Sequence, residues 1–566
     1  MGMGATNTLG RVCASLGLMS GVETDFQSGS DIANAGVLLA VPALVSSGLL
    51  HHVEECFHLP AGYYTLQQLF LLLAFLALCR IKYFEQLRYC SPGEWGKILG
   101  LDRIPEVKVV REKIALFSKQ EKATEWSALL CKEWMEADPA SAGVLYVDGH
   151  VRVYHGSRTL LPRHFVARQR LCLRATVDYW VNAMDGNPFF RINRAVDPGL
   201  LTVLRDEIIP SLEADVPGQP MPEQLQADPL LHRFSIIIDR EGYSPDLFAE
   251  LKNKRIALIT YRKFPGDDWQ AGEFEKYTSI NKRTGATVRV RLAERGVRLS
   301  NGLWVREIRK LCESGHQTSL LSTDYKSDLC PVAEELFSRW SQENFFKYMR
   351  ENYNLDRLVD YRTEPIPDTT RVVNPRYREL DSQVRSATST LSRRLQEFGA
   401  LHLSGDMEEQ KVEGFEKDKS QLQLQINHLQ EKIDLLKEDR KKVAHHITVK
   451  ELPDDQRFDR LSTQSKHLVD TIKMIAYRAE TAMASVLKEI LSDKEDARRM
   501  VKRICTGEAD MLVDNEKCTL TVRLHHQACQ SQDAAARKLC EELNATETVF
   551  PGSNLKLVYE IMGSEN

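Results

Sequence analysis

The chain has 566 residues, of which 43% are hydrophobic and 27% charged, with a formal net charge of −4 at pH 7. A chain of this length can form roughly three or four domains of about 150 residues each, and its composition is that of a globular protein with large cores. The net charge neither indicates nor excludes a nucleic-acid partner, because the distribution of charge decides that.

The cysteines and the apolar runs argue against a zinc ribbon, a disulfide scaffold and a membrane-spanning protein. The 12 cysteines contain no Cys-x-x-Cys pair, which argues against a zinc ribbon or a disulfide scaffold and indicates reduced thiols. The most apolar run, Leu69 to Cys79, is shorter than the ~20 residues that a membrane-spanning helix needs. The run from Gly36 to Leu50 is interrupted by a proline and two serines. We therefore expect a cytoplasmic protein with no membrane partner.

The first part of the chain is predicted to be helical after a short tail. Residues 1–30 are rich in Gly, Ser and Asn, which is typical of a flexible tail. Residues 31–136 have a helical pattern and predict an all-α domain.

A possible helix-turn-helix is the most specific pattern in this helical domain. Ser91 and Pro92 fit the N-cap and first position of a short helix, a turn containing Gly100 follows, and a second helix carries Lys108 and Arg111. This arrangement fits a DNA-binding helix-turn-helix, although any helical hairpin has similar spacing. We expect Lys108 and Arg111 to contact DNA.

Two apolar runs between residues 141 and 365 each end in a carboxylate. Val144–Val147 precedes Asp148, and Phe234–Ile238 precedes Asp239. Both runs have the length and composition of buried strands. Ligands in open α/β sheets collect at the carboxyl ends of the strands, so both aspartates are candidate site residues.

The order of elements around these runs predicts the fold of residues 141–365. Further strands are expected at 151–154, 170–180 and 255–261, and a helix at 197–212. The first two strand runs are close enough for a hairpin, a third strand follows, and helix and strand then alternate. This is the order of a ribonuclease-H-like α/β fold.

Two more features belong to this predicted domain. Residues 262–323 contain alternating patterns at 287–292 and 303–308, which predict a β-rich insertion. Residues 333–352 then predict a helix that carries Glu343.

The last third of the chain predicts an arm and a further domain. Residues 376–446 contain apolar residues at three- and four-residue spacing and a short heptad seam, which predicts either a helical hairpin or a coiled coil between two chains. Residues 450–566 combine helical patterns with strands such as Thr519–Leu524 and predict an α+β domain without a catalytic constellation.

Asp148, Asp239 and Glu343 together carry the predicted chemistry. Hard oxygen ligands select Mg²⁺ or Mn²⁺ over zinc. Two such ions can activate an attacking water or 3′-hydroxyl and stabilise the leaving oxygen. Carboxylates clustered so closely repel one another without metal, and some of their pKa values rise. A lone Asp after a strand is usually a solvated charge, so the prediction depends on the three acids occurring together.

Basic residues near these acids predict contact with the DNA backbone. No acidic residue occurs between Val151 and Arg174, and arginine favours bidentate phosphate contacts. The predicted phosphate-contacting residues are Arg152, Arg158, Arg163, Arg168 and Arg170 after the first Asp, and Arg339, Lys347 and Arg350 on the helix of the Glu.

The surroundings of the three acids resemble the catalytic triad of DDE transposases from bacterial insertion sequences. The matching segments are VDGH around Asp148, DREGY from Asp239, and FSRWSQENFFKYM around Glu343. The resemblance covers roughly residues 30 to 375, and the whole chain is similar to long bacterial transposases.

The resemblance is closest to a branch of that family with a β-rich insertion before the catalytic Glu. That branch carries a Tyr, Arg, Glu, Lys signature on the last helix. Arg339 and Glu343 match the Arg and the Glu. Leu336 and Arg350 stand where the Tyr and the Lys would be, although Arg350 keeps the positive charge.

The resemblance implies a function and its partners. It implies that Asp148, Asp239 and Glu343 bind Mg²⁺ or Mn²⁺, that water cleaves double-stranded DNA at the element ends, and that the freed 3′-hydroxyl attacks a target or the opposite strand. It also implies a homodimer or larger synaptic complex in the bacterial nucleoid. The alternatives are a metal-dependent nuclease without strand transfer, and a domesticated DNA-binding protein without catalysis, which the intact triad disfavours.

Overall fold

The computed structural model describes residues 7–563, apart from 157–160, 167–168, 195, 281–286, 358–362, 365, 402–408, 454–456, 458–459 and 492–493. The chain divides into two compact units. The core unit comprises Met1–Tyr154, Arg163–Arg362 and Leu461–Asn566, and the arm unit comprises His155–Pro162 and Thr363–Arg460. Among the described residues, no helix is long and apolar enough to cross a membrane.

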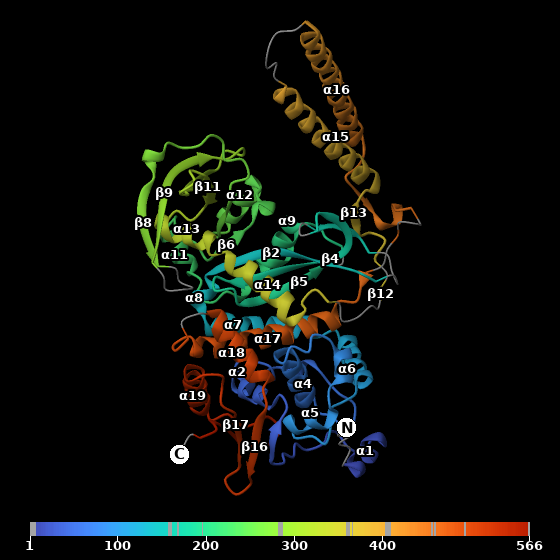
Figure 1. The fold of residues 1–566 in the computed structure, drawn as a ribbon, viewed down its shortest axis with the longest axis vertical. Helices are drawn as coiled ribbons and strands as arrows, with labels where there is room; N and C mark the ends of the chain where they lie inside the picture. Colours follow the sequence, from blue (N-terminus) through green and yellow to red (C-terminus); the bar gives the residue numbers. More distant parts are fainter. Residues whose placement is uncertain are drawn as a thin grey trace. The chain divides into compact units, whose positions relative to one another are not determined.

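A ten-stranded mixed sheet organises the middle of the core unit (Figure 1). Its first half runs in the order β5-β4-β2-β6-β7. β3 also pairs with β4, on the side of β4 opposite to β2. β4 is antiparallel to both β2 and β5, whereas β2, β6 and β7 are parallel. The strands are β2 (Val144–Val153), β3 (Arg163–Val166), β4 (Leu171–Ala183), β5 (Pro188–Arg194), β6 (Ser235–Ile238) and β7 (Ala257–Tyr261).

The strand prediction needs one correction in this half. Residues 144–150 and 151–154 do not form two separate strands, because Val144–Val153 is one continuous strand that pairs along its length with β4. The third antiparallel strand is β5, which the sequence patterns did not predict. The predicted strands at 170–180 and 255–261 are confirmed as β4 and β7.

The second half of the sheet comes from residues 262–323. Four antiparallel strands extend the sheet beyond β7 in the order β11-β10-β9-β8. Two of them were predicted, and β8 and β11 were not. The strands are β8 (Glu275–Ile280), β9 (Thr287–Arg298), β10 (Trp304–Leu311) and β11 (Gln317–Ser322).

Helices connect the parallel strands and follow the sheet. The connection from β5 to β6 contains a π-helical turn where a regular helix was predicted. The helix predicted over 333–352 is also divided, because backbone bonds to the third preceding residue tighten the chain at Arg339–Gln342. The elements are α9 (Leu200–Val203), η3 (Leu204–Ile208), α10 (Ile209–Asp215), α11 (Pro222–Ala227), η4 (Arg240–Gly242), α12 (Pro245–Asn253), η5 (Ala271–Glu273), α13 (Leu329–Phe337) and α14 (Trp340–Tyr353).

The N-terminal part is helical, as predicted, but it does not begin with a loose tail over its described residues. The Arg11 guanidinium donates to the Asp102 carboxylate at 2.9 Å, and Gly29–Ile32 forms a strand paired with a C-terminal strand. The elements are α1 (Thr8–Ser15), β1 (Gly29–Ile32), η1 (Ala35–Ala40), α2 (Val41–Ser46), α3 (Val53–Cys56), α4 (Leu66–Leu78), η2 (Phe84–Tyr89), α5 (Pro92–Ile98), α6 (Val107–Lys119), α7 (Ala123–Ala137) and α8 (Pro139–Ala142).

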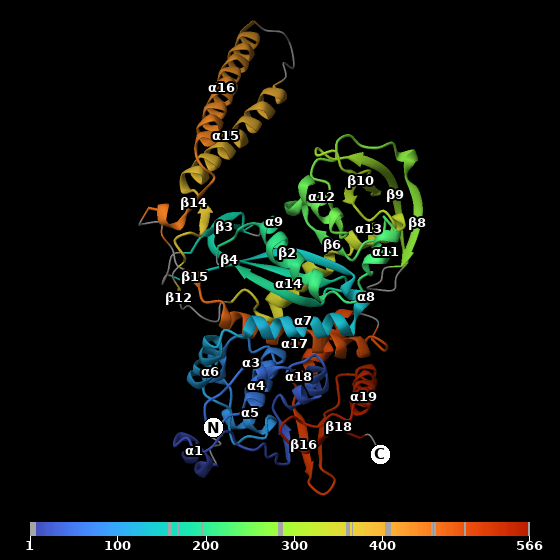
Figure 2. The same cartoon turned by 180° about the vertical axis from the view of Figure 1, so that it is seen from behind.

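The C-terminal segment belongs to the same body as the N-terminal helices. α17 (Gln464–Leu487) packs against α2, α4, α6 and α7, and both views show it between α2 and α4 on one side and the large sheet on the other, with α7 alongside it (Figures 1 and 2). A four-stranded sheet of order β1-β16-β17-β18 joins the two ends of the chain. The remaining elements are α18 (Lys494–Thr506), β16 (Ala509–Asp514), β17 (Thr519–Leu524), α19 (Gln530–Asn544) and β18 (Lys556–Ile561).

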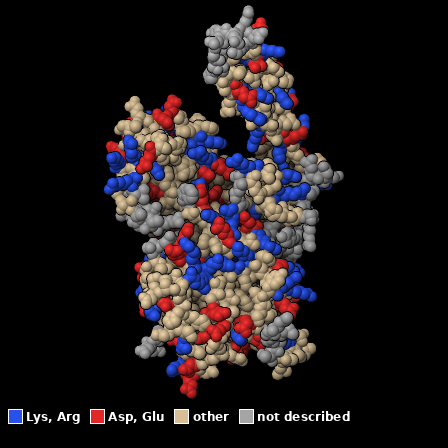
Figure 3. All heavy atoms as spheres, viewed as in Figure 1, with Lys and Arg blue, Asp and Glu red and all other residues tan. Residues whose placement is uncertain are grey.

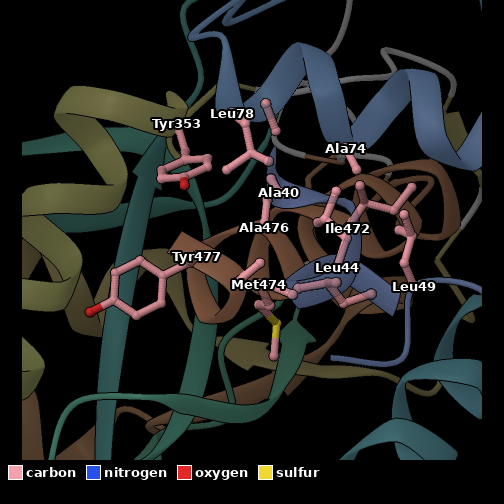
Figure 4. Close-up of a cluster of buried hydrophobic side chains, with 14 of the residues drawn as sticks. Ala40, Leu44, Leu49, Ala74, Leu78, Tyr353, Ile472, Met474, Ala476 and Tyr477 are labelled. Carbon is pink, nitrogen blue, oxygen red and sulfur yellow. The ribbon is translucent and has the colours of Figure 1, made fainter. Parts of the chain in front are cut away.

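The reason for this arrangement is the apolar surface of α17. Ile472, Met474 and Ala476 lie in a fully buried cluster with Leu44 of α2 and Leu78 of α4 (Figure 4). α4 is apolar on nearly all sides and buries every residue from Gln68 to Leu78, so it needs neighbours all round. α17 supplies one of them from the other end of the chain.

The arm unit contains an antiparallel helical hairpin. α15 (Pro375–Ala400) and α16 (Glu409–Lys442) pack against each other, and Ile426 and Ile433 of the heptad seam are buried. The other seam residues, Leu422, Leu429 and Leu436, are half-buried. The other elements here are β12 (Thr363–Glu364), β13 (Arg371–Val373), β14 (His446–Thr448) and η6 (Val449–Glu451), and β15 (Arg460–Leu461) ends the unit.

Candidate active site

The structure brings Asp148, Asp239 and Glu343 together around one guanidinium group. Arg339 Nη1 lies 3.5 Å from Asp148 Oδ2, and Arg339 Nη2 lies 3.8 Å from Asp239 Oδ2. The same Nη2 lies 2.7 Å from Glu343 Oε1. Acids that are 91 and 104 residues apart in the sequence, from 239 − 148 and 343 − 239, thus face a single cation.

The register of two parallel strands places the two aspartates side by side. β2 and β6 pair from Val144 with Ser235 as far as Val147 with Ile238. The residue that follows the last pair is Asp148 in one segment and Asp239 in the other. Asp148 Oδ1 accepts the Gly149 backbone N–H at 2.8 Å, and the Asp239 carboxylate accepts the Arg240 N–H at 2.7 Å. These bonds orient both carboxylates.

Polar side chains fasten the first turn of α14 to the sheet and so position Glu343. The buried Gln342 amide donates to Asn182 Oδ1 at 2.9 Å and lies 3.3 Å from the Tyr146 carbonyl. The Ser341 hydroxyl donates to the Met184 carbonyl at 2.8 Å. A helix held at its first turn by buried hydrogen bonds presents the next residue, Glu343, at a defined place.

The electrostatics of the site follow from its acids. Burial raises the pKa of Asp148 to about 7, the charge of Asp239 adds to this rise, and Arg339 opposes it. Burial alone would lower the pKa of Arg339, but the carboxylates of Asp239, Asp148 and Glu343 outweigh it and raise that pKa. The acids and Arg339 are therefore electrostatically coupled, and the positive charge of Arg339 offsets part of the repulsion between the carboxylates.

Two further acids near the triad were not among the predicted residues. Burial raises the pKa of Glu241, and the charges of Asp197 and Asp239 add to the rise. Asp197 accepts a hydrogen bond from the Tyr179 hydroxyl. Glu241 lies in the same DREGY segment as Asp239. Its closeness in sequence to Asp239 could have marked it as a candidate site residue. Nothing in the local pattern marked Asp197.

The three carboxylates fit the predicted divalent ions by their chemistry. The donor set consists of oxygen atoms, which suits Mg²⁺ or Mn²⁺. All three carboxylates contact the guanidinium group of Arg339. Figure 3 shows Asp and Glu side chains gathered in the middle of the molecule at the level of β2 and α14, with Lys and Arg side chains next to them.

The prediction that Arg152 contacts DNA is wrong. Its side chain is fully buried and bonds the Asp178 carboxylate of β4, and its Nη1 donates to Asp470 Oδ2 of α17 at 3.3 Å. Arg191 of β5 lies 3.2 Å from Asp178 and 3.3 Å from Asp470. Lys466 also bonds Asp470. Alternation along β2 puts Arg152 on an inner face, where its charge is matched by protein carboxylates.

The other predicted DNA-contacting residues differ in how they are engaged. Arg158 and Arg168 lie outside the described residues, whereas Arg163 and Arg170 are exposed, as is Lys347. Arg350 is half-buried and its Nε donates to the Phe346 carbonyl. Arg339 faces the triad rather than an open surface.

Two helices occur where the helix-turn-helix was predicted, and the two basic residues of the second already have acidic neighbours. The elements are α5 and α6. The Lys108 side chain is 86% exposed and lies 4.0 Å from Glu112. Arg111 bonds Glu85. Lys108 is therefore the more accessible of the two for a phosphate.

Comparison with known families of proteins identifies a match. The model of a family described as "Transposase protein" matches residues 2–563, which is nearly the whole chain. No curated protein matches the sequence.

Proposed function

Since the chain belongs to this transposase family, we propose that it cleaves and joins DNA by DDE chemistry in a ribonuclease-H-like core. The strand order β5-β4-β2-β6-β7, with three antiparallel strands followed by two that run parallel to the first, supports this fold. The family match carries the transposase assignment, and the geometry of the acids carries the proposed chemistry.

The observation that carries the proposed chemistry is the convergence of Asp148, Asp239 and Glu343 on Arg339. The aspartates lie where two parallel strands end their pairing, which is where ligands of α/β sheets collect. We assign these three carboxylates to two Mg²⁺ or Mn²⁺ ions. When bound, such ions neutralise charge that develops on the attacking and leaving oxygens of an in-line displacement.

The residues around the triad have separate proposed roles. Arg339 neutralises the acids in the metal-free protein and keeps them close to one another. Gln342 and Ser341 hold the first turn of α14 against the sheet. Because Glu343 is thereby already placed near the strand ends, its side chain loses little conformational entropy when the metal ions bind. We assign Lys347, which is exposed one helical turn after Glu343, to contact with the reacting phosphate.

Substitution of the triad tests the proposal. Asp148→Asn, Asp239→Asn and Glu343→Gln should each reduce cleavage of element-end DNA at least about 1000-fold, since each removes a metal ligand whose charge acts at the reacting atoms. Binding of the same DNA should remain, because phosphate contacts come from other residues. Gel assays of cleavage and binding with Mg²⁺ or Mn²⁺ measure both.

The controls separate this proposal from its alternatives. Asp246→Asn changes an acid in the first turn of α12 and should leave cleavage unchanged. Cleavage that persists in the triad variants would contradict the assigned site. Cleavage of end DNA without joining to a second duplex would instead favour a nuclease without strand transfer. Repeating the assay with a mixture of two differently labelled end DNAs tests the pairing of two ends. Products that carry both labels are expected if a dimer or larger complex holds both ends.

A further inference from the structure

A second group of metal-ligating side chains lies where the two ends of the chain meet. Asp31 of β1, Asp510 of β16 and His525, just after β17, direct one ligand atom each to a common point, and these atoms lie within 4.8 Å of one another. The three residues come from three neighbouring strands of the four-stranded sheet. None of them contributes to the triad.

The backbone of β1 is shaped to bring Asp31 to this point. Gly29 pairs with Met511 and Ile32 with Ala509, so β1 has one more residue than its partner strand in this interval. Such a bulge re-aims a side chain. Asp31 also adopts a φ of 54°, which Asp tolerates better than most residues. Its own N–H donates to Asp510 Oδ1 at 3.0 Å.

The His525 contacts in the group are long for direct hydrogen bonds and are compatible with a shared metal ion. His525 Nε2 lies 3.4 Å from Asp510 Oδ1 and 3.5 Å from Asp31 Oδ1. A strong charge-assisted hydrogen bond measures about 2.7–2.9 Å, and one Nε2–H can donate well to only one of the two acids. Ligands at about 2.0–2.1 Å from a tetrahedral Zn²⁺ are separated by roughly 3.3–3.5 Å, which matches both separations.

The burial of the group agrees with a site that is open to solvent on one side. The Asp510 side chain is 9% exposed, that of His525 31%, and that of Asp31 72%. A buried carboxylate with a second carboxylate turned towards it needs a compensating charge. The imidazole and two carboxylates form a mixed nitrogen and oxygen donor set, which suits a divalent transition metal rather than Mg²⁺.

We propose that Asp31, Asp510 and His525 bind a divalent transition-metal ion of the Zn²⁺ type that fastens β1 to the C-terminal sheet. The ion links residues 479 positions apart in the sequence, and so it stabilises the junction of the N-terminal and C-terminal segments by binding only the folded chain. This proposal does not depend on the DNA chemistry of the triad.

Zinc titration of the full chain tests the proposal. The starting protein carries Asp148→Asn, Asp239→Asn and Glu343→Gln, so that the triad does not compete. Calorimetric titration with Zn²⁺ near pH 8 should show a site whose affinity falls at least about 100-fold in Asp31→Asn and in His525→Gln, since each removes a direct ligand. Asn keeps the backbone conformation of residue 31, so this variant should fold normally.

The neighbouring histidine provides a matched control. His526 pairs with Asp533 at 3.0 Å and is not part of the group, so His526→Gln should retain Zn²⁺ affinity. Zn²⁺ should raise the unfolding midpoint of the starting protein and of His526→Gln, but not that of Asp31→Asn. Unchanged affinity in both site variants, an equal loss in His526→Gln, or no Zn²⁺ binding by the starting protein would overturn the proposal.

Discussion

At the scale of single residues, Arg339 connects the three acids of the site. It is the common partner of Asp148, Asp239 and Glu343, and its side chain is only 11% exposed. Without it, three carboxylates would face one another with no cation between them. A single side chain thus decides how much repulsion the folded protein contains before metal binds.

Arg339→Gln should therefore destabilise the metal-free protein and make it more dependent on metal. The expected loss is about 1–2 kcal/mol, below that of a fully buried pair because the acids are partly exposed. Mn²⁺ should restore more stability to the variant than it adds to the wild type. Urea unfolding with and without Mn²⁺ measures both. Arg350→Gln on the same helix is the control, and an equal response of the two variants would contradict this role.

A second residue-scale prediction concerns His467, which is buried beside Arg152, Arg191 and Asp470. Burial is the main cause that lowers the pKa of His467 to about 3, with a contribution from the positive charge of Arg191 and opposition from Asp470. The unfolded chain binds this proton near pH 6.5, whereas the folded chain does not until about pH 3. Stability is therefore lost as the pH falls from about 6.5 towards 3.

His467→Gln should remove this part of the acid sensitivity. Between pH 7.5 and pH 5 the free energy of unfolding of the wild type should fall by about 2 kcal/mol more than that of the variant. This follows because pH 5 lies about 1.5 units below the unfolded-state pKa of about 6.5, and each unit contributes about 1.4 kcal/mol. Urea unfolding at the two pH values gives the difference. His526→Gln changes an exposed histidine and should keep the wild-type slope. A His467→Gln slope equal to that of the wild type would refute the prediction.

At the scale of elements, α17 connects distant parts of the chain through two buried acids. The first is Asp470, which pairs with Arg152, and the second is Glu480. The fully buried Glu480 accepts hydrogen bonds from the Tyr348 and Tyr353 hydroxyls of α14. It also pairs with Arg80, which follows α4, and lies 3.6 Å from Arg498 of α18. The helix that carries Glu343 is thereby held at its far end by the C-terminal segment.

Glu480→Gln should destabilise the protein by about 3–5 kcal/mol, because it leaves two buried arginines without their counter-charge. Tyr353→Phe should cost less, about 1–2 kcal/mol, for one hydrogen bond. A double-mutant cycle should show a coupling of about 0.5–3 kcal/mol between the two. Glu489→Gln, an exposed acid just after α17, should have almost no effect. Additive effects of Glu480→Gln and Tyr353→Phe would argue against this connection.

At the scale of the whole molecule, the two ends of the chain depend on each other. β1 pairs with β16, and α17 fills the apolar surroundings of α2 and α4. The arm helices, by contrast, begin and end at adjacent places, because Val373 of β13 pairs with His446 of β14. The core unit should therefore need residues after 460 and should not need the hairpin.

Two deletions test this difference. A chain ending at residue 460 should be insoluble or lack a cooperative unfolding transition, because it exposes the buried cluster around α4. Replacement of residues 376–444 by a short Gly-Ser linker should leave a cooperative transition with a midpoint near that of the full chain. Circular dichroism and thermal unfolding measure both. A cooperative transition in the 1–460 chain would contradict the expected dependence.

The sequence by itself predicted much of the molecule. It predicted the transposase family, which the family match confirms, several strands of the large sheet, the helices α5 and α6, and the acids that converge. The strands and helices could be predicted because apolar periodicity is a local property of the chain, whereas the family was predicted from the resemblance of the segments around the three acids. The DDE chemistry, the metal ions and the ribonuclease-H-like fold stay proposals.

Tertiary structure decided what local patterns do not carry. It paired β1 with β16, placed α17 among the N-terminal helices, and packed α15 against α16. It also buried Arg152 against Asp178 and Asp470 instead of leaving it for DNA. The physical reason is that the partner of a side chain, apolar or charged, is chosen by packing between distant segments, and the spacing of residues within one segment does not record that choice.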